Sequence, residues 1–290
     1  MIDLHTHTTA SDGRCTPAEL VARASAAGVT VLSVTDHDTV AACDAVAAAC
    51  AAAGIEFVPG IEITAVRDDA DVHMLGYFMD PGSASLRAFL SEQRAQRVDR
   101  VRRIILKLAG FGLRLDADAI LKPALDEESR SVGRPWVARA LIAAGYVTST
   151  NEAFGTWLSR GRPGFIPREG AAPESVLTRI HEAGGIASMA HPGLLGFDDW
   201  IPPLAEAGLD AIEAYHTDHA PEDTARYLAM AGRLGLAVSG GSDYHADESH
   251  GATHPGAVSL PRDAYQRLIR CATSARLKPR PTYAIENPTS

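Results

Sequence analysis

Two kinds of apolar pattern alternate along the chain. Short runs in which most positions are apolar or β-branched are typical of buried parallel strands. Seven such runs occur, at 2–6, 29–37, 55–64, 71–79, 186–191, 209–216 and 237–245. Apolar residues that recur every three or four positions are typical of helices packed on one face. These segments cover 17–28, 40–54, 173–184, 200–208, 222–235 and 262–272. Thr16 followed by Pro17 is a typical helix start, and Gly28 and Gly54 are typical helix ends.

Repeated strand–helix units predict a parallel sheet with helices outside it. Seven strands suit a closed or nearly closed barrel, so the expected fold class is α/β, a distorted (β/α)7 TIM-like barrel. The alternation is interrupted at 84–112, which has the pattern of one long amphipathic helix, and helical segments without a convincing strand continue to about residue 165. We therefore predict a barrel domain from residues 1–95 and 166–290, with a small helical domain inserted over 96–165.

Composition narrows the class of protein. The formal net charge is −9, which argues against binding of long nucleic acid or of anionic membranes. None of the four cysteines forms a Cys-x-x-Cys pair, so Cys43 and Cys50 are expected to be free thiols buried in a helix. The N-terminus lacks signal-peptide features, and no apolar run reaches the ~18 residues of a membrane span. We expect a cytoplasmic protein that binds no membrane, and the sequence makes no prediction of its oligomeric state.

Histidines and carboxylates gather at the ends of the predicted strands. His5 and His7 lie at the end of the first run, and Asp12 follows shortly after it. In the later runs, His37 ends the second, Glu62 lies near the end of the third, His73 lies in the fourth, His191 ends the fifth, and Asp243 and His245 end the seventh. The carboxyl ends of barrel strands share one face, so these side chains should converge. Residues i and i+2 of a strand point to the same side, so His5 and His7 can hold one ion together.

A metal centre explains this cluster better than packing does. A single histidine at a strand end is usually hydrogen-bonded or exposed. Six at the ends of different strands would repel one another when protonated and leave donors unsatisfied when neutral. Imidazole and carboxylate ligands suit zinc, manganese or iron(II), and nine ligands are enough for two to three divalent ions with a bridging carboxylate. His181, His250 and His254 fall on a helix or in loops and are not assigned to the centre.

The motifs HTHTTASDG, TDHD, PGIEI, AHP and GSDYH together resemble those of the PHP (polymerase and histidinol phosphatase) superfamily. The resemblance covers the predicted barrel and implies a metal-dependent phosphoesterase, an enzyme of the hydrolase class. Within that superfamily, SVGRPWVARALIAAGYV and GRPGFIP are similar to the insert of stand-alone bacterial phosphoesterases. These act on nucleoside 5′-monophosphates such as AMP, on 3′,5′-bisphosphates and, in some members, on the 5′ ends of short RNA. The implied partner is therefore a small nucleotide or a short oligonucleotide.

The resemblance also implies how the ligands are shared. One ion would take His5, His7, Glu62 and Asp243; a second would share Glu62 and add His73 and His191; a third would take Asp12, His37 and His245. Many members of the superfamily have histidine where this sequence has Asp12. A carboxylate there changes the charge and the metal preference of the third site, and it resembles the nucleotide-phosphatase branch more than the histidinol phosphatases.

A phosphate ester needs a nucleophile at neutral pH and relief of its negative charge. We expect attack by a metal-bridging hydroxide, because bound ions lower the pKa of water towards ~7. Arg134, Ser131 and Arg168 are candidate phosphate contacts, since an arginine fork matches a phosphate and helix amides can assist it. A surface arginine that caps a helix is the alternative for Arg134. His216 and His219 are candidate catalytic and substrate-binding residues, with His219 as the possible proton donor to the leaving oxygen.

Charged residues elsewhere receive simpler interpretations. Positions three apart share a helix face, and the run Arg94, Arg97, Arg100, Arg102 and Arg103 is expected to be a solvated face paired with Glu92 and Asp99. Guidance of an anionic substrate is the alternative. Asp36 and Asp38 flank His37, and we expect them to face away from it and to support the ligands or cap a helix.

Three other functions compete with nucleotide phosphatase. A 5′-3′ exoribonuclease that trims short RNA could use the same residues. Histidinol phosphatase is disfavoured by the insert and by Asp12. A metal-binding regulatory module without turnover is disfavoured because every expected ligand position is filled.

Overall fold

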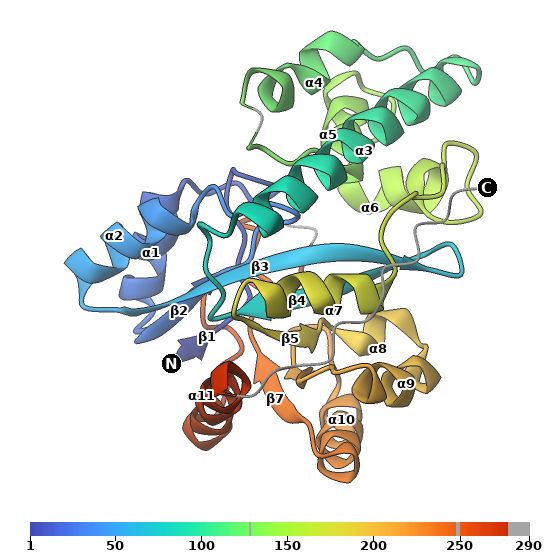
Figure 1. Cartoon of the computed structure of the whole chain (residues 1–290). Coiled ribbons are helices and arrows are strands. Elements are labelled where there is room, and N and C mark those ends of the chain that lie inside the picture. Colours follow the sequence, from blue (N-terminus) through green and yellow to red (C-terminus); the bar gives the residue numbers. More distant parts are fainter. Residues whose placement is uncertain (128, 248–249, 278–290) are drawn as a thin grey trace.

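Seven strands form one sheet in the order β1 to β7 (Figure 1). The computed structural model describes residues 1–127, 129–247 and 250–277. The strands are β1 (Ile2–Asp3), β2 (Val31–Val34), β3 (Glu56–Arg67), β4 (Ala70–Tyr77), β5 (Ile186–Met189), β6 (Ala211–Tyr215) and β7 (Ala237–Gly240). Each lies within or overlaps a run identified from the apolar pattern. The expectation of an all-parallel sheet is wrong at β4, which pairs antiparallel with both β3 and β5, whereas the other neighbours are parallel.

A two-residue turn causes this reversal. Asp68 and Asp69 join β3 to β4 with φ values of 50° and 59°. Positive φ at both central residues is the geometry of a tight hairpin, and aspartate tolerates it better than most residues. A parallel connection would need a crossover of a dozen residues or more, so this turn can produce only a hairpin.

The sheet closes almost completely into a barrel. The Leu4 amide donates to the Gly240 carbonyl at 3.2 Å, and Thr6 forms a parallel bridge with Tyr244. These contacts bring the segment after β7 beside the segment after β1. The predicted fold class, a distorted seven-stranded TIM-like barrel, is confirmed.

Helices pack around the barrel or form the predicted insert. They are α1 (Pro17–Ala26), α2 (Cys43–Ala53), α3 (Ala84–Ala109), α4 (Ala117–Asp126), α5 (Arg134–Ala143), α6 (Thr150–Ala153), α7 (Pro173–Glu182), α8 (Pro192–Leu195), α9 (Ile201–Glu206), α10 (Pro221–Leu234) and α11 (Arg262–Leu277). Thr16 caps α1 through a reciprocal capping box with Glu19, and Gly54 ends α2 with a φ of 69°. Both ends follow the sequence signals.

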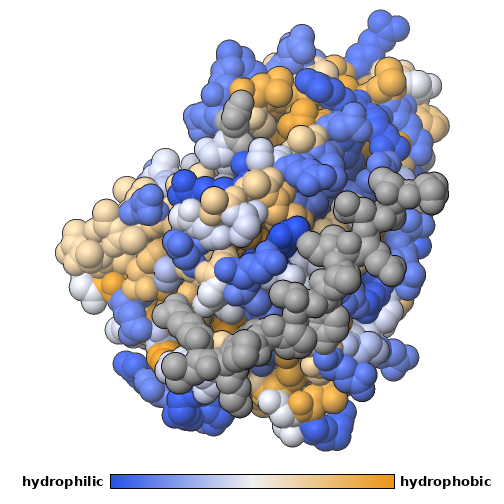
Figure 2. Space-filling view, viewed as in Figure 1, coloured by the Kyte–Doolittle hydropathy of each residue, from blue (hydrophilic) through white to orange (hydrophobic). Residues whose placement is uncertain are grey.

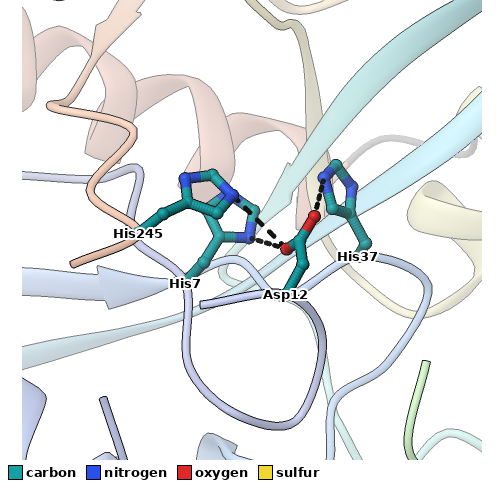
Figure 3. Close-up of side chains that lie close together, drawn as sticks. All are labelled: His7, Asp12, His37 and His245. Atoms are coloured by element: carbon teal, nitrogen blue, oxygen red, sulfur yellow. Dashed lines mark ion pairs between the residues drawn. The ribbon is translucent and has the colours of Figure 1, made fainter. Parts of the chain in front are cut away.

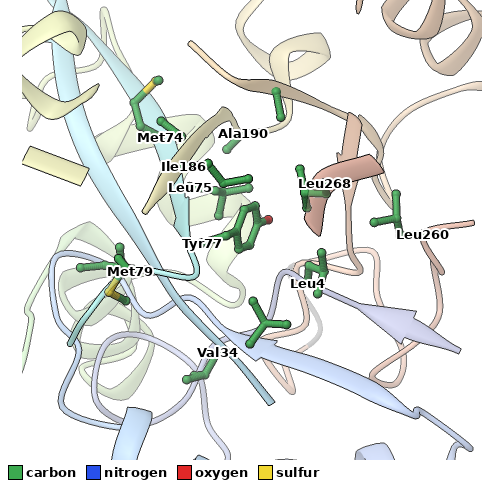
Figure 4. Close-up of a cluster of buried hydrophobic side chains, with 14 of the residues drawn as sticks. Leu4, Val34, Met74, Leu75, Tyr77, Met79, Ile186, Ala190, Leu260 and Leu268 are labelled. Carbon is green, nitrogen blue, oxygen red and sulfur yellow. The ribbon is translucent and has the colours of Figure 1, made fainter. Parts of the chain in front are cut away.

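Two apolar cores lie along α3, one at each end of the helix. The larger core fills the barrel and includes Leu4, Leu75 and Tyr77 (Figure 4). The smaller core runs from Val101 to Leu158 among α3, α4, α5 and the turn after α6. The first turns of α3 pack on the barrel core and its later turns on the smaller core, and Figure 1 shows α3–α6 gathered on one side of the sheet. The domain boundaries 1–95, 96–165 and 166–290 stay a prediction.

The surface is mixed in character. Figure 2 shows pale orange over α1 and α2, where alanines of α2 are exposed, and orange groups over the inserted helices. Cys43 and Cys50 are buried free thiols, as expected. Within the described residues, no helix is both long enough and apolar enough to cross a membrane.

Candidate metal centre and substrate cavity

The barrel brings all nine predicted ligands into one cluster. His5 and His7 follow β1, His37 follows β2, Glu62 lies in β3, His73 in β4, His191 follows β5, and Asp243 and His245 follow β7, while Asp12 comes from the loop after β1. His73 lies on the antiparallel strand, where it pairs with Thr64, so it enters the cluster from within a strand. Most of these side chains are fully buried or nearly so; His37 and His73 are partly exposed.

Glu62 lies at the centre of the cluster. Its Oε2 lies 3.3 Å from Nε2 of both His5 and His7 and 3.2 Å from Nδ1 of His37. Its Oε1 lies 2.7 Å from Nδ1 of His73 and 3.1 Å from Nε2 of His191. One carboxylate thus offers a different oxygen to each of two sets of imidazoles, which is the arrangement that a bridging ligand requires.

Asp243 completes the first of these sets. Its Oδ1 lies 3.3 Å from Nε2 of His5 and 3.1 Å from Nε2 of His7. The ligand atoms of His5, His7, Glu62 and Asp243 all lie within 4.8 Å of one another, so these four side chains can share one ion.

Asp12 forms a further group with three imidazoles (Figure 3). Its carboxylate oxygens lie 3.9 Å from Nδ1 of His7, 3.7 Å from Nε2 of His37 and 3.3 Å from Nε2 of His245. His7 therefore stands between this group and the one that contains Asp243. The sequence placed His37 and His245 here and did not foresee that His7 also faces Asp12.

The loop that carries Asp12 is tightly held. Asp36 accepts hydrogen bonds from the amide and hydroxyl of Thr8 and from the hydroxyl of Ser11. A side chain at Gly13 would lie 2.5 Å from the His7 backbone, so only glycine fits this approach. Asp36 therefore supports the loop of Asp12 through Thr8 and Ser11, and not through a histidine as predicted.

Several buried atoms of the cluster make no hydrogen bond of ordinary geometry to any described residue. They are Nδ1 and Nε2 of His7, Oδ1 of Asp12, Nδ1 of His37, His73 and His191, and Nε2 of His245. Leaving buried polar atoms unsatisfied is costly. Because these atoms are imidazole nitrogens and one carboxylate oxygen that converge, they fit divalent metal ions.

Charges inside the cluster shift its pKa values. Burial opposes protonation of His7, but the nearby carboxylates of Asp243 and Glu62 outweigh it and raise its pKa to about 10. Burial lowers the pKa of His37 to about 3, against the attraction of Glu62 and Asp12. Burial also opposes ionisation of Glu62, but the surrounding imidazoles hold its pKa well below the usual range. Because the pKa of His7 is raised, a metal ion must compete with a proton for this imidazole.

The expectation of a solvated arginine face on α3 is wrong for Arg97 and Arg100. Both side chains are buried, and Arg97 forms an ion pair with the buried Asp38. Arg100 pairs with Asp71 at 3.2 Å. Asp38 directly follows the predicted ligand His37, and Asp71 lies two residues before the predicted ligand His73. These two barrel carboxylates pair with the arginines and so account for the burial of this helix face. Arg103 does lie on the surface, with Asp99 and Glu169.

Two more arginines complete a basic wall. Arg134 shares Asp71 with Arg100, at 2.9 Å, and Arg168 shares Asp38 with Arg97, at 2.7 Å. Together with Asp12, His37 and His73 these four arginines line a cavity of about 230 Å³. Predicted ligands therefore form one wall of the cavity and guanidinium groups another.

Comparison with known proteins agrees with this geometry. The sequence model of the PHP domain matches residues 3–128. The chain is 33% identical to a 3′,5′-nucleoside bisphosphate phosphatase of Chromobacterium violaceum, over 93% of this chain and 99% of that protein. It is 35% identical to a 5′-3′ exoribonuclease of Haemophilus influenzae, over 84% of this chain and 89% of that protein. A proposed metal-dependent phosphoesterase from Bifidobacterium adolescentis superposes with a TM-score of 0.84 at 31% identity, over 93% and 95% of the two chains.

The chain belongs to the PHP family. It is a metal-dependent phosphoesterase and therefore a hydrolase, as the motifs predicted.

Three other predicted site residues of this PHP chain, His216, His219 and Ser131, are not among the nine predicted ligands, and their contacts differ from one another. His216 is buried, with Nε2 3.4 Å from Asp243 and Nδ1 accepting the Asp218 amide. Both ring nitrogens of His219 bond backbone groups, the Ala214 carbonyl and the Gly193 amide. Ser131 is buried at the base of the insert, and its amide donates to the Ala10 carbonyl at 2.9 Å.

Sequence reasoning missed two residues of this PHP site. Glu213 is fully buried and lies 2.9 Å from Nδ1 of His5, and a buried acid within an apolar strand was the available signal. His250, which was left outside the centre, stacks on His245 with ring centroids 3.7 Å apart and lines the cavity. Its loop position carried no such signal. His181 and His254 bond Asp210 and a backbone carbonyl instead.

Proposed function

We propose that this PHP phosphoesterase hydrolyses the phosphate monoester of small nucleotides, 5′-AMP or nucleoside 3′,5′-bisphosphates. The observation that carries the proposal is the cavity with metal ligands on one wall and arginines on the other. A nucleotide phosphate needs both, because one set of groups must activate water and the other must hold anionic oxygens.

The ligands would hold two to three divalent ions, manganese, zinc or iron, in three groups. The first is His5, His7, Glu62 and Asp243, the second is Glu62, His73 and His191, and the third is Asp12, His37 and His245. When bound, such ions supply a water of lowered pKa and neutralise phosphoryl charge. Support comes from the two-sided contacts of Glu62 and from the unsatisfied buried nitrogens.

The arginine wall would bind the phosphate oxygens. Arg97 uses all three guanidinium nitrogens on Asp38, Val132 and Thr64, so its role is positional. Nη2 of Arg100 and Nε of Arg168 are buried and make no hydrogen bond to the described residues.

Charge also favours an anion at this wall. Within the part of the chain that the structure describes, four guanidinium groups form ion pairs with two carboxylates, Asp38 and Asp71. The wall therefore keeps positive charge and open donors, which suit a dianionic phosphate. Arg134, Arg168 and Arg100 are the proposed contacts, with Ser131 and the start of α5 beside them.

His216 is the better candidate of the two for a catalytic role. Its Nε2 makes no hydrogen bond within the described residues, and it faces Asp243. Proton transfer from His219 would require its ring to release the Gly193 amide or the Ala214 carbonyl. We therefore propose that His219 binds substrate or positions the loop after β5, and that His216 acts on the reacting group.

A 5′-3′ exoribonuclease of short RNA is the second candidate. A larger cavity of about 850 Å³ adjoins the first, since His250 lines both, and Arg14 and Arg23 lie along it. It could take nucleotides beyond the first one. The relatives named as exoribonucleases match this chain about as well as the bisphosphate phosphatase does.

A phosphate-release screen tests these alternatives. Purified protein with added Mn²⁺ would be given 5′-AMP, 3′-phosphoadenosine 5′-phosphate, a short 5′-phosphorylated RNA and histidinol phosphate. We expect turnover of the nucleotides that EDTA abolishes. Chromatography of the same reactions would detect mononucleotides, which are the products of an exoribonuclease. Release of mononucleotides from the short RNA that is faster than phosphate release from any mononucleotide would favour the exoribonuclease. Hydrolysis of histidinol phosphate alone, or of nothing, would refute the proposal.

A further inference from the structure

Four consecutive carbonyl groups of the Asp12 loop bind the insert. The carbonyls of Thr9, Ala10, Ser11 and Asp12 each accept one hydrogen bond, from Nε of Arg130 at 2.8 Å, the amide of Ser131 at 2.9 Å, Nε1 of Trp136 at 3.1 Å and Nη1 of Arg139 at 3.1 Å respectively. The donors all lie between residues 130 and 139. A ten-residue piece of the insert thus fixes the backbone on which a candidate ligand is carried.

The three side-chain donors form one packed unit. The guanidinium carbons of Arg130 and Arg139 each lie 5.7 Å from the centre of the Trp136 ring. Cation–π contact holds such groups together and limits their rotamers. Because Trp136 and Arg139 both belong to α5, rigid movement of that helix would move two of the donors together.

The barrel holds the same loop from the other side. Asp36 binds Thr8 and Ser11, and the carboxylate of Asp12 then faces His37 and His245. The ligands of the other two groups are carried by strands or by the residues that directly follow them. Of the nine predicted ligands, Asp12 depends most on the conformation of a loop. Side chains of the insert donate hydrogen bonds to the backbone of that loop.

We infer that Arg130, Trp136 and Arg139 are positioning residues for Asp12, and that they thereby govern whether the third ligand group takes an ion. The inference rests on the proposed three-group metal centre. It assigns the insert a function that is separate from the arginine wall: the insert completes the metal centre as well as the substrate cavity.

The test is metal binding by full-length variants. Trp136→Phe removes the Nε1 donor and keeps a ring for the arginines, and Arg139→Met removes the second donor. The matched control combines Trp200→Phe and Arg102→Met, which replace the same residue types away from this loop. Bound metal would be measured by plasma mass spectrometry after equilibrium dialysis, and Co²⁺ absorption would report the geometry of each site. Thermal unfolding of the metal-free proteins would report folding.

We expect the wild type and the control to bind about three equivalents. The double variant that combines Trp136→Phe with Arg139→Met should keep about two equivalents of metal. It should bind the third equivalent roughly 10- to 100-fold more weakly, which is the usual effect of losing groups that orient ligands. Arg139→Lys, in the Trp136→Phe background, should restore part of that affinity because it returns a cationic donor.

Three outcomes would overturn the inference. Loading of the double variant equal to that of the wild type would show that the insert does not position Asp12. Equal weakening of all ions would show a general loss of structure. A wild type that never binds more than about two ions would remove the third group itself, although EDTA-sensitive phosphate release would then still support a phosphoesterase.

Discussion

Glu213 lies 2.9 Å from Nδ1 of His5, and both side chains are fully buried. The other carboxylate oxygen of Glu213 accepts the backbone amide of His191 at 2.8 Å. A carboxylate at Nδ1 fixes the imidazole tautomer that leaves Nε2 available to a metal. Glu213 thus orients the predicted ligand His5, which follows β1, and the backbone of the predicted ligand His191, which follows β5.

Replacing Glu213 with Gln should weaken metal binding. An amide can accept from His5 or from the His191 amide with its single oxygen, but not from both. We expect roughly 10- to 100-fold lower affinity, the usual cost of losing a partner of a ligating histidine. Competition with a chelator at fixed pH would measure it. An unchanged affinity would mean that neighbouring strands orient His5 without Glu213.

Much of the metal cluster follows from sequence rules about strands. His5 and His7 point together because strand side chains alternate, and His37, His191, Asp243 and His245 converge with them because strand ends meet at one face of a barrel. His73 enters from within the antiparallel β4 and Asp12 from a loop, so the strand-end rule does not cover them. Glu213 escaped attention because it lies inside β6 rather than at its end. Its partner His5, just after β1, lies 208 residues away in the sequence, and no local pattern shows that pairing.

The arginine wall could not be predicted for a related reason. The face of α3 that carries Arg97 and Arg100 is regular and charged, which is also the pattern of a solvated helix. Only the packed structure shows that Asp38 and Asp71 lie opposite. The antiparallel β4, by contrast, was accessible from the sequence, since the six residues between the runs 55–64 and 71–79 leave no room for a crossover.

Substitution of Arg134 should impair nucleotide binding more than metal binding. Arg134→Met removes a guanidinium that faces the cavity beside Asp71. A hydrogen bond to a charged group contributes about 1.5–3 kcal/mol, so we expect KM for a nucleotide to rise roughly 10- to 100-fold. Steady-state kinetics with each nucleotide would measure it.

Arg102→Met is the matched control, because Arg102 is exposed on α3. It should leave KM unchanged. Equal effects of the two variants would point to long-range attraction of substrate rather than to contact at the cavity.

Metal loading should release protons and strengthen as the pH rises. The pKa of His7 is raised to about 10 in the metal-free protein, so His7 carries a proton at neutral pH. A ligating imidazole must be neutral, and an ion must therefore displace that proton. The sign follows: apparent affinity falls as the pH is lowered and rises as the pH approaches 10.

Calorimetric titration in two buffers with different ionisation enthalpies would count the released protons. A heat of binding that is the same in both buffers, with affinity independent of pH between 7 and 9, would contradict a protonated metal-free cluster.

Asp38 should matter for stability even though it is not a predicted ligand. It is fully buried and pairs with both Arg97 and Arg168, which join α3 and the segment before α7 to the loop after β2. Removing one partner of a buried ion pair typically costs about 3–5 kcal/mol, because a buried charge is left uncompensated. Asp38→Asn should therefore lower the free energy of unfolding by an amount of that order, measured by urea denaturation of the metal-free protein.

The pH dependence of this contribution has a definite sign. Burial alone would raise the pKa of Asp38, but Arg97 and Arg168 lower it from 3.8 to about 2. The stabilisation is thus complete above the ordinary pKa and is lost as the pH falls towards 2. Asp99→Asn, at a solvent-exposed pair with Arg103, is the control and should change stability by less than about 1 kcal/mol. If both variants unfold at the same urea concentration as the wild type, the buried arginine pairs do not hold the insert to the barrel.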